Sequence, residues 1–153
     1  MGESKSKMYE ILETVIPHLS QNKPRYLMGV GTPEDLLEGI ERGVDMFDCV
    51  HPTRMARHGA FWTENGRFNI KGEKFKTDYS ALQKGCTCET CKSYSKSYLR
   101  HLIIENEILG LKLMTIHNLH FLINLMQLCR TNIEKNNFGK FKKDFLKKFK
   151  SKK

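Results

Sequence analysis

The residues best suited to chemistry in this sequence are three cysteines, Cys86, Cys88 and Cys91, in the spacing Cys-x-Cys-x-x-Cys. Thiols this close in the sequence meet at one point only if the backbone between them turns tightly, and Gly85 just before them suits such a loop. A histidine further along the chain, His117, completes a Cys3His set. Ligands of this kind form closed tetrahedral zinc sites, which stabilise structure and leave no open position for a substrate.

Two questions about these cysteines stay open at the level of sequence. Buried or disulfide-bonded cysteines are the alternative to a metal site, but clustered, unevenly spaced thiols in a chain without a secretion signal favour a metal. The N-terminal segment is polar and lacks the apolar region of a signal peptide. The histidine is the less defined ligand, because His101 and His120 lie near His117 in the sequence. The pattern therefore predicts one structural zinc ion.

A second candidate for chemistry is Asp48, which lies at the end of an apolar run and is followed by Arg54 and Arg57. A carboxylate at the end of a strand can attack an anomeric carbon and stabilise an oxocarbenium-like transition state. The two arginines are close enough along a loop to bind phosphates, and guanidinium groups make bidentate contacts with such oxyanions. An aspartate in this position is also a common helix cap or ion-pair partner, so the spacing alone does not establish catalysis.

The elements around this aspartate form a predicted βαβ unit. A helix that ends at Pro17 comes first, and residues 25–31 and 44–50 are then short apolar strands. Between the strands, Thr32 caps a second helix, which ends near Gly43. A strand, a helix and a strand in so few residues predict two parallel strands, apolar on both faces because both are covered. Because two parallel strands do not make a stable sheet, this part must belong to a larger α/β structure.

In α/β barrels and open α/β sheets, active sites lie at the carboxyl ends of the parallel strands. Met28 and Gly29 lie at the end of the first strand, as Asp48 does at the end of the second. A glycine there lets a ligand approach the backbone, although glycine serves ordinary tight turns equally well.

The remainder of the chain reads as a hairpin, the cysteine loop and helices. Residues 61–70 alternate around an Asn-Gly pair, a strong hairpin signal. Helices are predicted from Ser93 to about Asn106 and from Leu111 to Lys135, with Gly110 marking the break. We therefore divide the chain into the βα units with the active-site loop, a hairpin and zinc-binding subdomain, and C-terminal helices: residues 1–60, 61–117 and 93–153.

The net charge of +9 is concentrated at the C-terminus, where residues 138–153 carry eight lysines and one acidic residue. Four phenylalanines recur there at helical spacing, which predicts a helix docked by its aromatic face with its lysines outward. Solvated lysines are the ordinary interpretation, and contact with RNA is the alternative. The most apolar stretch, residues 119–126, is interrupted by His120 and Asn124 and is too short to cross a bilayer. We expect a cytoplasmic chain with reduced thiols and no membrane contact.

Several of these segments together resemble bacterial tRNA-guanine transglycosylases. They are residues 25–31 (RYLMGVG), residues 42–54 (RGVDMFDCVHPTR), the Cys-x-Cys-x-x-Cys loop and residues 115–119 (TIHNL). Their order and spacing agree with the family from Gly2 almost to the C-terminus. The resemblance implies the C-terminal part of a (β/α)8 TIM barrel, containing its last strands, with an inserted Cys3His zinc subdomain and C-terminal helices.

The resemblance also implies a reaction, in which an enzyme carboxylate displaces guanine from the wobble position of the tRNA anticodon. A 7-deazaguanine precursor of queuosine then takes its place. Asp48 matches the nucleophile of the family, which forms a covalent link to the ribose. The other matched positions are Met28 and Gly29 in the base pocket, Arg54 and Arg57 on the segment that grips the anticodon stem-loop, and Cys86, Cys88, Cys91 and His117 as zinc ligands.

This chain departs from the family mainly in length. The N-terminal half has no counterpart here, and it supplies most barrel strands, the general acid/base aspartate and the residues that read the base. A truncated gene product, a fragment and one half of a split enzyme are the competing explanations, and activity would then require that half or a homodimer partner. The alternative function is a non-catalytic, zinc-containing RNA-binding or assembly subunit, but the retained Asp48 favours the enzyme.

Overall fold

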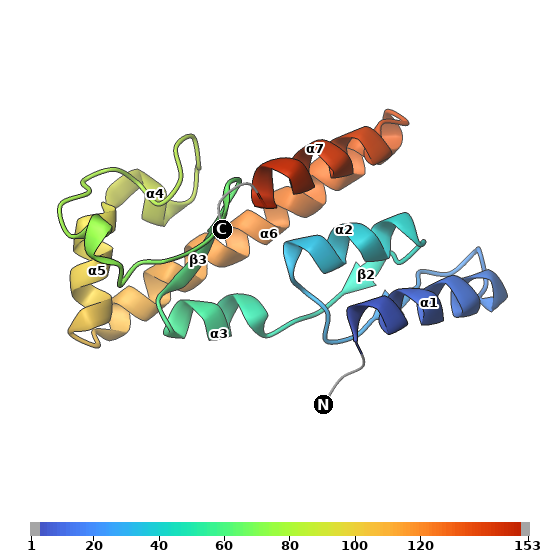
Figure 1. Ribbon diagram of the computed structural model, residues 1–153, viewed down its shortest axis with the longest axis horizontal. Helices are drawn as coiled ribbons and strands as arrows, with labels where there is room; N and C mark the ends of the chain where they lie inside the picture. Colours follow the sequence, from blue (N-terminus) through green and yellow to red (C-terminus); the bar gives the residue numbers. More distant parts are fainter. Residues whose placement is uncertain (1–3, 151–153) are drawn as a thin grey trace. The chain divides into compact units, whose positions relative to one another are not determined.

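The structure, a computed structural model, describes residues 4–150, which divide into two compact units at the boundary between Val50 and His51. The first unit contains α1 (Lys5–Val15), a short 3-10 turn (Ile16–His18), β1 (Tyr26–Leu27), α2 (Pro33–Glu41) and β2 (Met46–Phe47). The second contains α3 (His51–Arg57), the hairpin β3 (Ala60–Thr63) and β4 (Gly66–Asn69), a 3-10 turn (Glu73–Phe75), α4 (Glu89–Ser93), α5 (Lys96–Ile104), α6 (Ile108–Glu134) and α7 (Phe138–Lys150). Figure 1 shows these elements along the chain. The finer three-part division of the sequence stays a prediction.

The predicted βαβ unit is present. β1 and β2 pair in parallel, with Tyr26 opposite Met46 and Leu27 opposite Phe47. The expectation that both faces of these strands are covered is wrong. Phe47 packs on α2, where a side chain larger than glycine at Gly39 would clash with its ring. Tyr26 and Met46, on the other face, are about half exposed, at 51% and 49%. One face of the sheet is therefore open.

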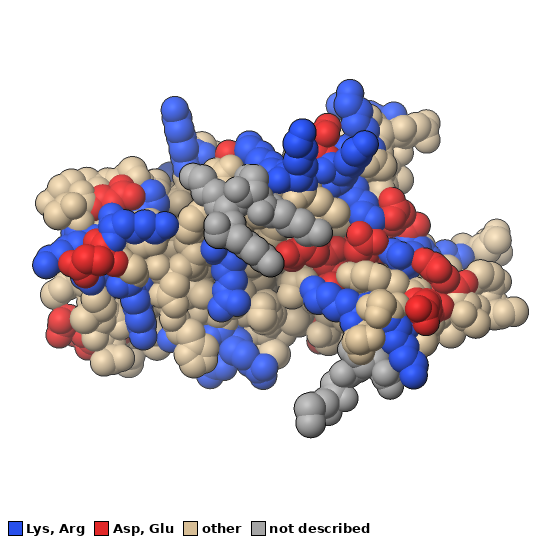
Figure 2. Space-filling view, in the orientation of Figure 1, with Lys and Arg blue, Asp and Glu red and all other residues tan. Residues whose placement is uncertain are grey.

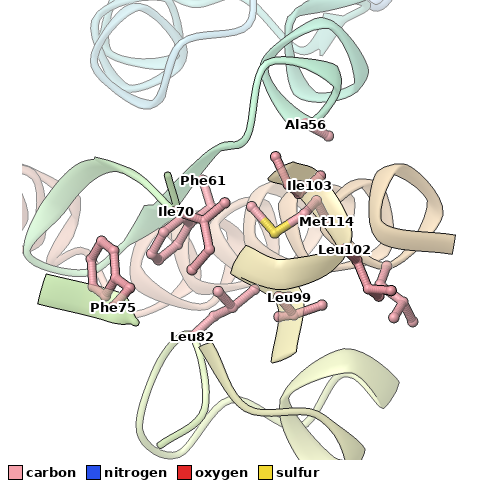
Figure 3. Packing of buried hydrophobic residues seen from close by; sticks show 10 residues of the cluster. Ala56, Phe61, Ile70, Phe75, Leu82, Leu99, Leu102, Ile103 and Met114 are labelled. Carbon is pink, nitrogen blue, oxygen red and sulfur yellow. The ribbon is translucent and has the colours of Figure 1, made fainter. Parts of the chain in front are cut away.

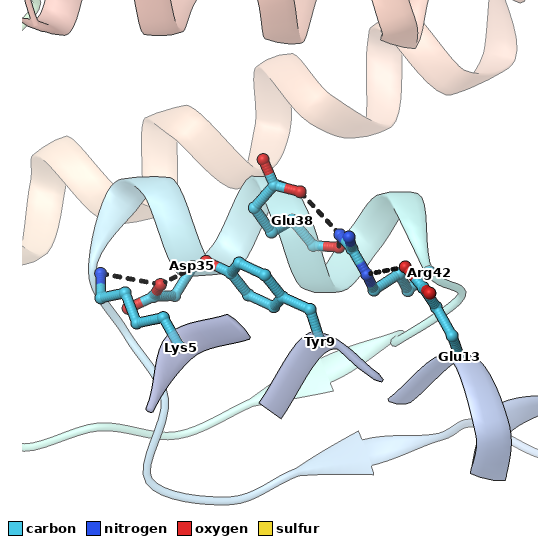
Figure 4. A network of polar contacts seen from close by, with 6 residues as sticks. All are labelled: Lys5, Tyr9, Glu13, Asp35, Glu38 and Arg42. Carbon is cyan, nitrogen blue, oxygen red and sulfur yellow. Dashed lines mark hydrogen bonds and ion pairs between the residues drawn. The ribbon is translucent and has the colours of Figure 1, made fainter. Parts of the chain in front are cut away.

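Polar contacts, more than apolar burial, hold α1 against α2. Only Leu12 of α1 is buried, whereas Tyr9 donates a 2.8 Å hydrogen bond to Asp35, which also pairs with Lys5 at 2.9 Å. At the other end of the two helices Arg42 pairs with Glu13 and Glu38, and its guanidinium lies 4.5 Å from the centre of the Tyr9 ring (Figure 4). The network fixes the entry to the βαβ unit.

The second unit has two apolar clusters separated by β3. Phe61 on this strand packs with Ile70, Leu99 and Met114 in the larger cluster (Figure 3). Trp62, its neighbour, packs on the other side with Phe121, because successive side chains of a strand point to opposite faces. All four residues of β3 are buried.

The predicted hairpin is confirmed, with Thr63 paired to Gly66 at its closed end. The predicted helix break at Gly110 is wrong, since α6 begins at Ile108 and contains this glycine. The chain turns instead at Asn106, whose φ is 58°. Gly110 is needed for close packing of α5 on α6, because a Cβ there would lie 2.8 Å from Leu102. A packing glycine and a breaking glycine look alike in sequence.

By length and composition, the whole of α6 could cross a membrane. The expectation that the apolar segment is too short for this, drawn from residues 119–126, is therefore wrong. The core helix of a globular domain has the same composition. α6 packs against α3, α5, α4, β3 and α7, and its centre carries the fully buried polar residues His117 and Asn118. These contacts favour the core helix over a membrane span.

We predict that Asp35→Asn loosens α1. Burial raises the pKa of this carboxyl, but hydrogen bonds from Lys5, Thr32 and Tyr9 outweigh burial and leave the pKa below its ordinary value. Because the pKa is lower in the folded state, the carboxylate stabilises the fold at neutral pH. This stabilisation begins to be lost as the pH falls below about 4 and disappears below the pKa of the folded state. Replacing the charged acceptor should cost about 1–3 kcal/mol at pH 7.

Amide hydrogen exchange in α1 at pH 7 and urea unfolding at pH 7 and pH 3.5 measure this effect. The variant should exchange faster than the wild type at pH 7, and the difference in urea unfolding between the two should be smaller at pH 3.5 than at pH 7. Asp45→Asn is the control, since Asp45 is exposed and an amide oxygen can still accept its hydrogen bond from the Arg25 N–H. Equal protection of α1 in the Asp35 variant and the wild type would contradict the prediction.

Candidate metal centre and carboxylate site

The cysteine loop is built as its sequence suggests. Gly85 has a φ of +78°, a left-handed conformation in which glycine is unstrained. Cys88 is the N-cap of α4, and its sulfur accepts a 3.3 Å hydrogen bond from the Cys91 N–H. Thr90, between these two cysteines, is fully buried and donates a 2.7 Å hydrogen bond to the Leu113 carbonyl of α6. The loop is therefore fastened to the helix that carries His117.

The four predicted ligands converge. The sulfur atoms of Cys86, Cys88 and Cys91 lie 3.8, 3.6 and 3.3 Å from Nδ1 of His117. All four ligand atoms lie within 4.8 Å of one another. Zinc–sulfur bonds of about 2.3 Å and a zinc–nitrogen bond of about 2.0 Å in a tetrahedron place ligand atoms about 3.5–3.8 Å apart. The arrangement fits one zinc ion with small adjustments of the thiol rotamers.

The other ring nitrogen of His117 explains why this histidine is the ligand. Its Nε2 lies 2.8 Å from the Trp62 carbonyl oxygen, and the side chain is fully buried. Because a carbonyl can only accept, Nε2 carries the proton and Nδ1 faces the thiols with its lone pair in the metal-bound form. The competing histidines are placed differently: His120 contacts Thr87 at 3.3 Å, and His101 is exposed. The geometry thus selects His117, as the family resemblance implies.

The thiols and the imidazole perturb one another's protonation. Burial raises the pKa of Cys88, but hydrogen bonds with His117 and the Cys91 N–H outweigh burial and bring it to about 6. Burial lowers the pKa of His117, and the three cysteine sulfurs overcome this and raise it to about 11. Without a metal, the sulfur atoms around the imidazole therefore favour its protonated form. A divalent metal takes the place of that positive charge and releases protons on binding.

Asn118, the residue after His117, is a residue of this site to which no motif of the sequence assigns a role. Its side-chain amide donates to the carbonyls of Pro52 and Ala60, at 3.1 and 3.0 Å, and its oxygen accepts from the Trp62 N–H at 3.3 Å. It is fully buried and joins α6 to α3 and β3. A polar pair, His-Asn, inside an apolar helix is the signal that could have drawn attention to it.

The second site is the carboxylate at the end of β2. One oxygen of Asp48, Oδ1, accepts hydrogen bonds from the Tyr26 hydroxyl at 2.8 Å and from the Gly29 N–H at 3.1 Å. Among residues 4–150, no other residue donates a hydrogen bond to the second oxygen, Oδ2. The hydrogen bond from Tyr26, followed by that from Gly29, lowers the pKa of Asp48 below its ordinary value. The carboxylate is therefore ionised at neutral pH and anchored through one oxygen.

Of the two residues predicted to line a base pocket, the structure brings one against Asp48. Gly29 has a φ of +74° and donates its N–H to the carboxylate. No atom would crowd a Cβ at this position, so the backbone conformation and not the space requires glycine. Met28 is 72% exposed beside it.

Arg54 and Arg57 lie on the helix α3, not on a loop as expected, and both are exposed. Pro52, Met55 and Ala56 of α3 are buried, so the helix is fixed by its apolar side. At a spacing of three residues the two arginines point to the same side of the helix. They belong to the second unit, whereas Asp48 belongs to the first.

The sequence profile of the queuine tRNA-ribosyltransferase family matches residues 1–151. Queuine tRNA-ribosyltransferases from Dictyoglomus turgidum and Thermoanaerobacter sp. are 50% and 51% identical over 149 residues, which are 97% of this chain and 38% and 40% of those proteins. The protein of that name from Buchnera aphidicola (strain 5A) is 54% identical over 147 residues, 96% of this chain and 40% of its own length. This chain belongs to the queuine tRNA-ribosyltransferase family. It spans about two-fifths of the length of these curated relatives.

We predict about one zinc ion per chain and its loss in Cys88→Ser. The substitution removes a thiolate and leaves the buried His117 with an incomplete site, so α4 and the loop should unfold together with the loss of metal. Metal analysis of the purified chain and circular dichroism measure the two effects. Cys49→Ser is the control, because Cys49 lies outside the cluster and should leave the zinc content unchanged. A wild-type chain that folds without metal would contradict the prediction.

Proposed function

We propose that this chain is the nucleophile-bearing and zinc-bearing portion of a tRNA-guanine transglycosylase, which exchanges the wobble guanine of tRNA for a 7-deazaguanine. The observation that supports this most directly is the ionised carboxylate of Asp48, held through Oδ1 with Oδ2 left for attack. The relatives named above carry the name of this activity. The residues of the family's motifs occur here at Asp48, the base-pocket positions and the zinc ligands.

The proposed reaction is a double displacement at the ribose. Oδ2 of Asp48 forms a bond to C1′ as the bond from C1′ to the guanine nitrogen breaks, and the electron pair leaves with guanine. Guanine is protonated as it departs. The 7-deazaguanine then loses a proton and attacks C1′, and Asp48 leaves as a carboxylate. Two displacements at one carbon retain its configuration. The resemblance implies that the family's acid/base aspartate lies in the N-terminal half, so the proton transfers are assigned to groups other than these residues.

The remaining site residues take supporting roles in this proposal. Met28 lies against the face of the exchanged base, and Gly29 fixes Asp48 with its N–H. Arg54 and Arg57 bind phosphates of the anticodon stem-loop, for which their exposure on one side of α3 suits them. The zinc ion has a structural role, because four protein ligands leave no position for a substrate. We place the reaction in the cytoplasm.

The open sheet supports the proposal that the βαβ unit completes a (β/α)8 barrel. Strands β1 and β2 pair only with each other among residues 4–150, and their exposed face carries Tyr26 and Met46. Unpaired strand edges and exposed apolar side chains are normally covered. Strands from the N-terminal half of the family fold, or from a second copy, would cover them and complete the active site.

Asp48→Asn tests the proposed activity. We expect the zinc-loaded chain, mixed with the N-terminal portion of a relative, to incorporate labelled guanine into tRNA, and the variant to lose incorporation by at least about a thousandfold. An amide keeps the shape and can still accept from Tyr26 and Gly29, but it is not a nucleophile. Asp45→Asn, on the same unit, should stay within about threefold of wild type. Exchange that survives in the Asp48 variant would refute the assignment and favour a non-catalytic RNA-binding subunit.

We further predict that Tyr26→Phe raises the pKa of Asp48. The hydroxyl is the largest influence that lowers this pKa, so its removal weakens the ionised form. Carbon-13 NMR of the labelled aspartate carboxyl measures the titration directly, and the acid limb of the exchange rate should move to higher pH. Tyr79→Phe is the control, because Tyr79 is 79% exposed. An unchanged Asp48 titration in Tyr26→Phe would show that the hydrogen bond does not form in solution.

A further inference from the structure

Helix α7 has an aromatic face that is fixed to the second unit. Phe138, Phe141, Phe145 and Phe149 follow one another along the helix at ring distances of 6.4, 6.0 and 5.4 Å. Phe149 stacks on Phe121 of α6 at 6.5 Å, and Phe121 stacks on Trp62 of β3 at 6.1 Å. Phe149 is only 6% exposed. The aromatic face of α7 is therefore continuous with the smaller apolar cluster.

The C-terminal end of α7 is also tied to the hairpin. A Cβ on Gly66 would lie 2.7 Å from the Phe149 carbonyl oxygen, so the hairpin backbone and the helix approach as closely as glycine permits. Lys148 pairs with Glu64 at 2.7 Å. Helix α7 is thus held at this end as well as along its aromatic face.

The opposite face of α7 is cationic. Lys140, Lys143 and Lys147 are exposed and lie at intervals of three and four residues, which places them in one row along the helix. Among residues 4–150 no ion pair neutralises these three lysines, and Asp144 is the only acidic residue of the helix. In Figure 2, where lysine and arginine are blue, blue side chains project from the part of the chain that forms α7, and all basic residues of this helix are lysines. We call this row the α7 lysine row.

A lysine-rich amphipathic helix could meet either of two polyanions, an anionic membrane or a nucleic acid. A membrane helix of this kind must insert its apolar face among the lipids. The apolar face of α7 is already packed against its own protein, with Phe149 buried and Phe138, Phe141 and Phe145 half-buried. What α7 offers to a partner is mainly a row of positive charges. Such a row suits the phosphates of an RNA backbone.

We propose that the α7 lysine row is a contact surface for the phosphate backbone of RNA, outside the active site. The inference rests on the proposed function, which makes tRNA the RNA in question. Contacts of this kind carry no sequence information and instead add affinity and fix orientation. The row would hold the body of the tRNA by its charge, and recognition of the wobble base would depend on the active site alone.

The test is the binding of fluorescent, unmodified tRNA to the zinc-loaded chain as a function of salt. Each released counterion contributes about fivefold in affinity at about 0.15 M salt, so losing two or three phosphate contacts costs roughly 25- to 150-fold and lowers the salt slope by about 2–3. We expect this loss for the triple variant Lys140→Gln, Lys143→Gln, Lys147→Gln. Glutamine has nearly the helix propensity of lysine, so α7 should persist.

The control removes the same charge from scattered exposed positions, as Lys23→Gln, Lys71→Gln, Lys112→Gln. It should change affinity and slope much less than the α7 variant. The triple Lys→Arg variant of the row keeps the charge and should bind like the wild type. Protection of the three lysines from acetylation by bound tRNA, read by mass spectrometry on the wild-type chain, gives an answer that does not depend on any variant folding.

Equal effects of the α7 and scattered variants, or acetylation of the row unchanged by tRNA, would overturn the proposal. Binding of the wild type to anionic phospholipid vesicles in preference to tRNA would also overturn it. These outcomes are distinct from those of the exchange assay. Asp48→Asn should abolish exchange without weakening tRNA binding, whereas the α7 variant should weaken binding to any tRNA whether or not exchange occurs.

Discussion

The second unit depends on the way in which one buried imidazole is satisfied at both of its nitrogens. A buried polar side chain in the middle of an apolar helix is costly unless each polar atom finds a partner. Nε2 of His117 meets the Trp62 carbonyl of β3, and Nδ1 meets the sulfur atoms of the cysteine loop. A metal ion at those sulfurs therefore joins the loop, the long helix and the hairpin in one step.

Asn118 extends this constraint to the helix that carries the two arginines. The side chains of consecutive helical residues point about 100° apart, so His117 and Asn118 contact different neighbours although they are adjacent on α6. The asparagine binds backbone groups of Pro52, Ala60 and Trp62, at the start of α3 and along β3. Because β3 receives hydrogen bonds from both residues, the position of α3 is coupled to the metal centre. A structural zinc can influence the proposed RNA-binding arginines in this way without touching a substrate.

Local features of the sequence predicted local structure well. The cysteine loop, the cap at Thr32, the hairpin and the docked aromatic helix all depend on neighbouring residues, and each is present. The predictions that were wrong, and the contacts that were not predicted, depend on residues that are distant in the chain. The sequence predicts a helix break at Gly110, but this glycine instead permits a close contact with Leu102 on α5, and such a contact has no sequence signature. Trp62 and Asn118, separated by 56 residues, meet only in the folded structure. The spacing of the histidines could not single out His117 either, because its contact with Trp62 also forms only in the folded structure.

The first unit provides one part of the proposed chemistry, the orientation and charge of the Asp48 carboxylate. It does not provide the other part, proton transfer and recognition of the base. The two groups that anchor Asp48 are the Tyr26 hydroxyl, from the neighbouring strand β1, and the Gly29 N–H, from the turn after it. The direction of Oδ2 and the charge of the carboxylate are thus fixed by two parallel strands and their short loops. In the proposed reaction, proton transfer and recognition of the base are left to groups that these residues do not provide. Although one face of the sheet is exposed here, Asp48 is anchored by groups of its own unit, and completing the proposed barrel would add specificity to a carboxylate that is already oriented.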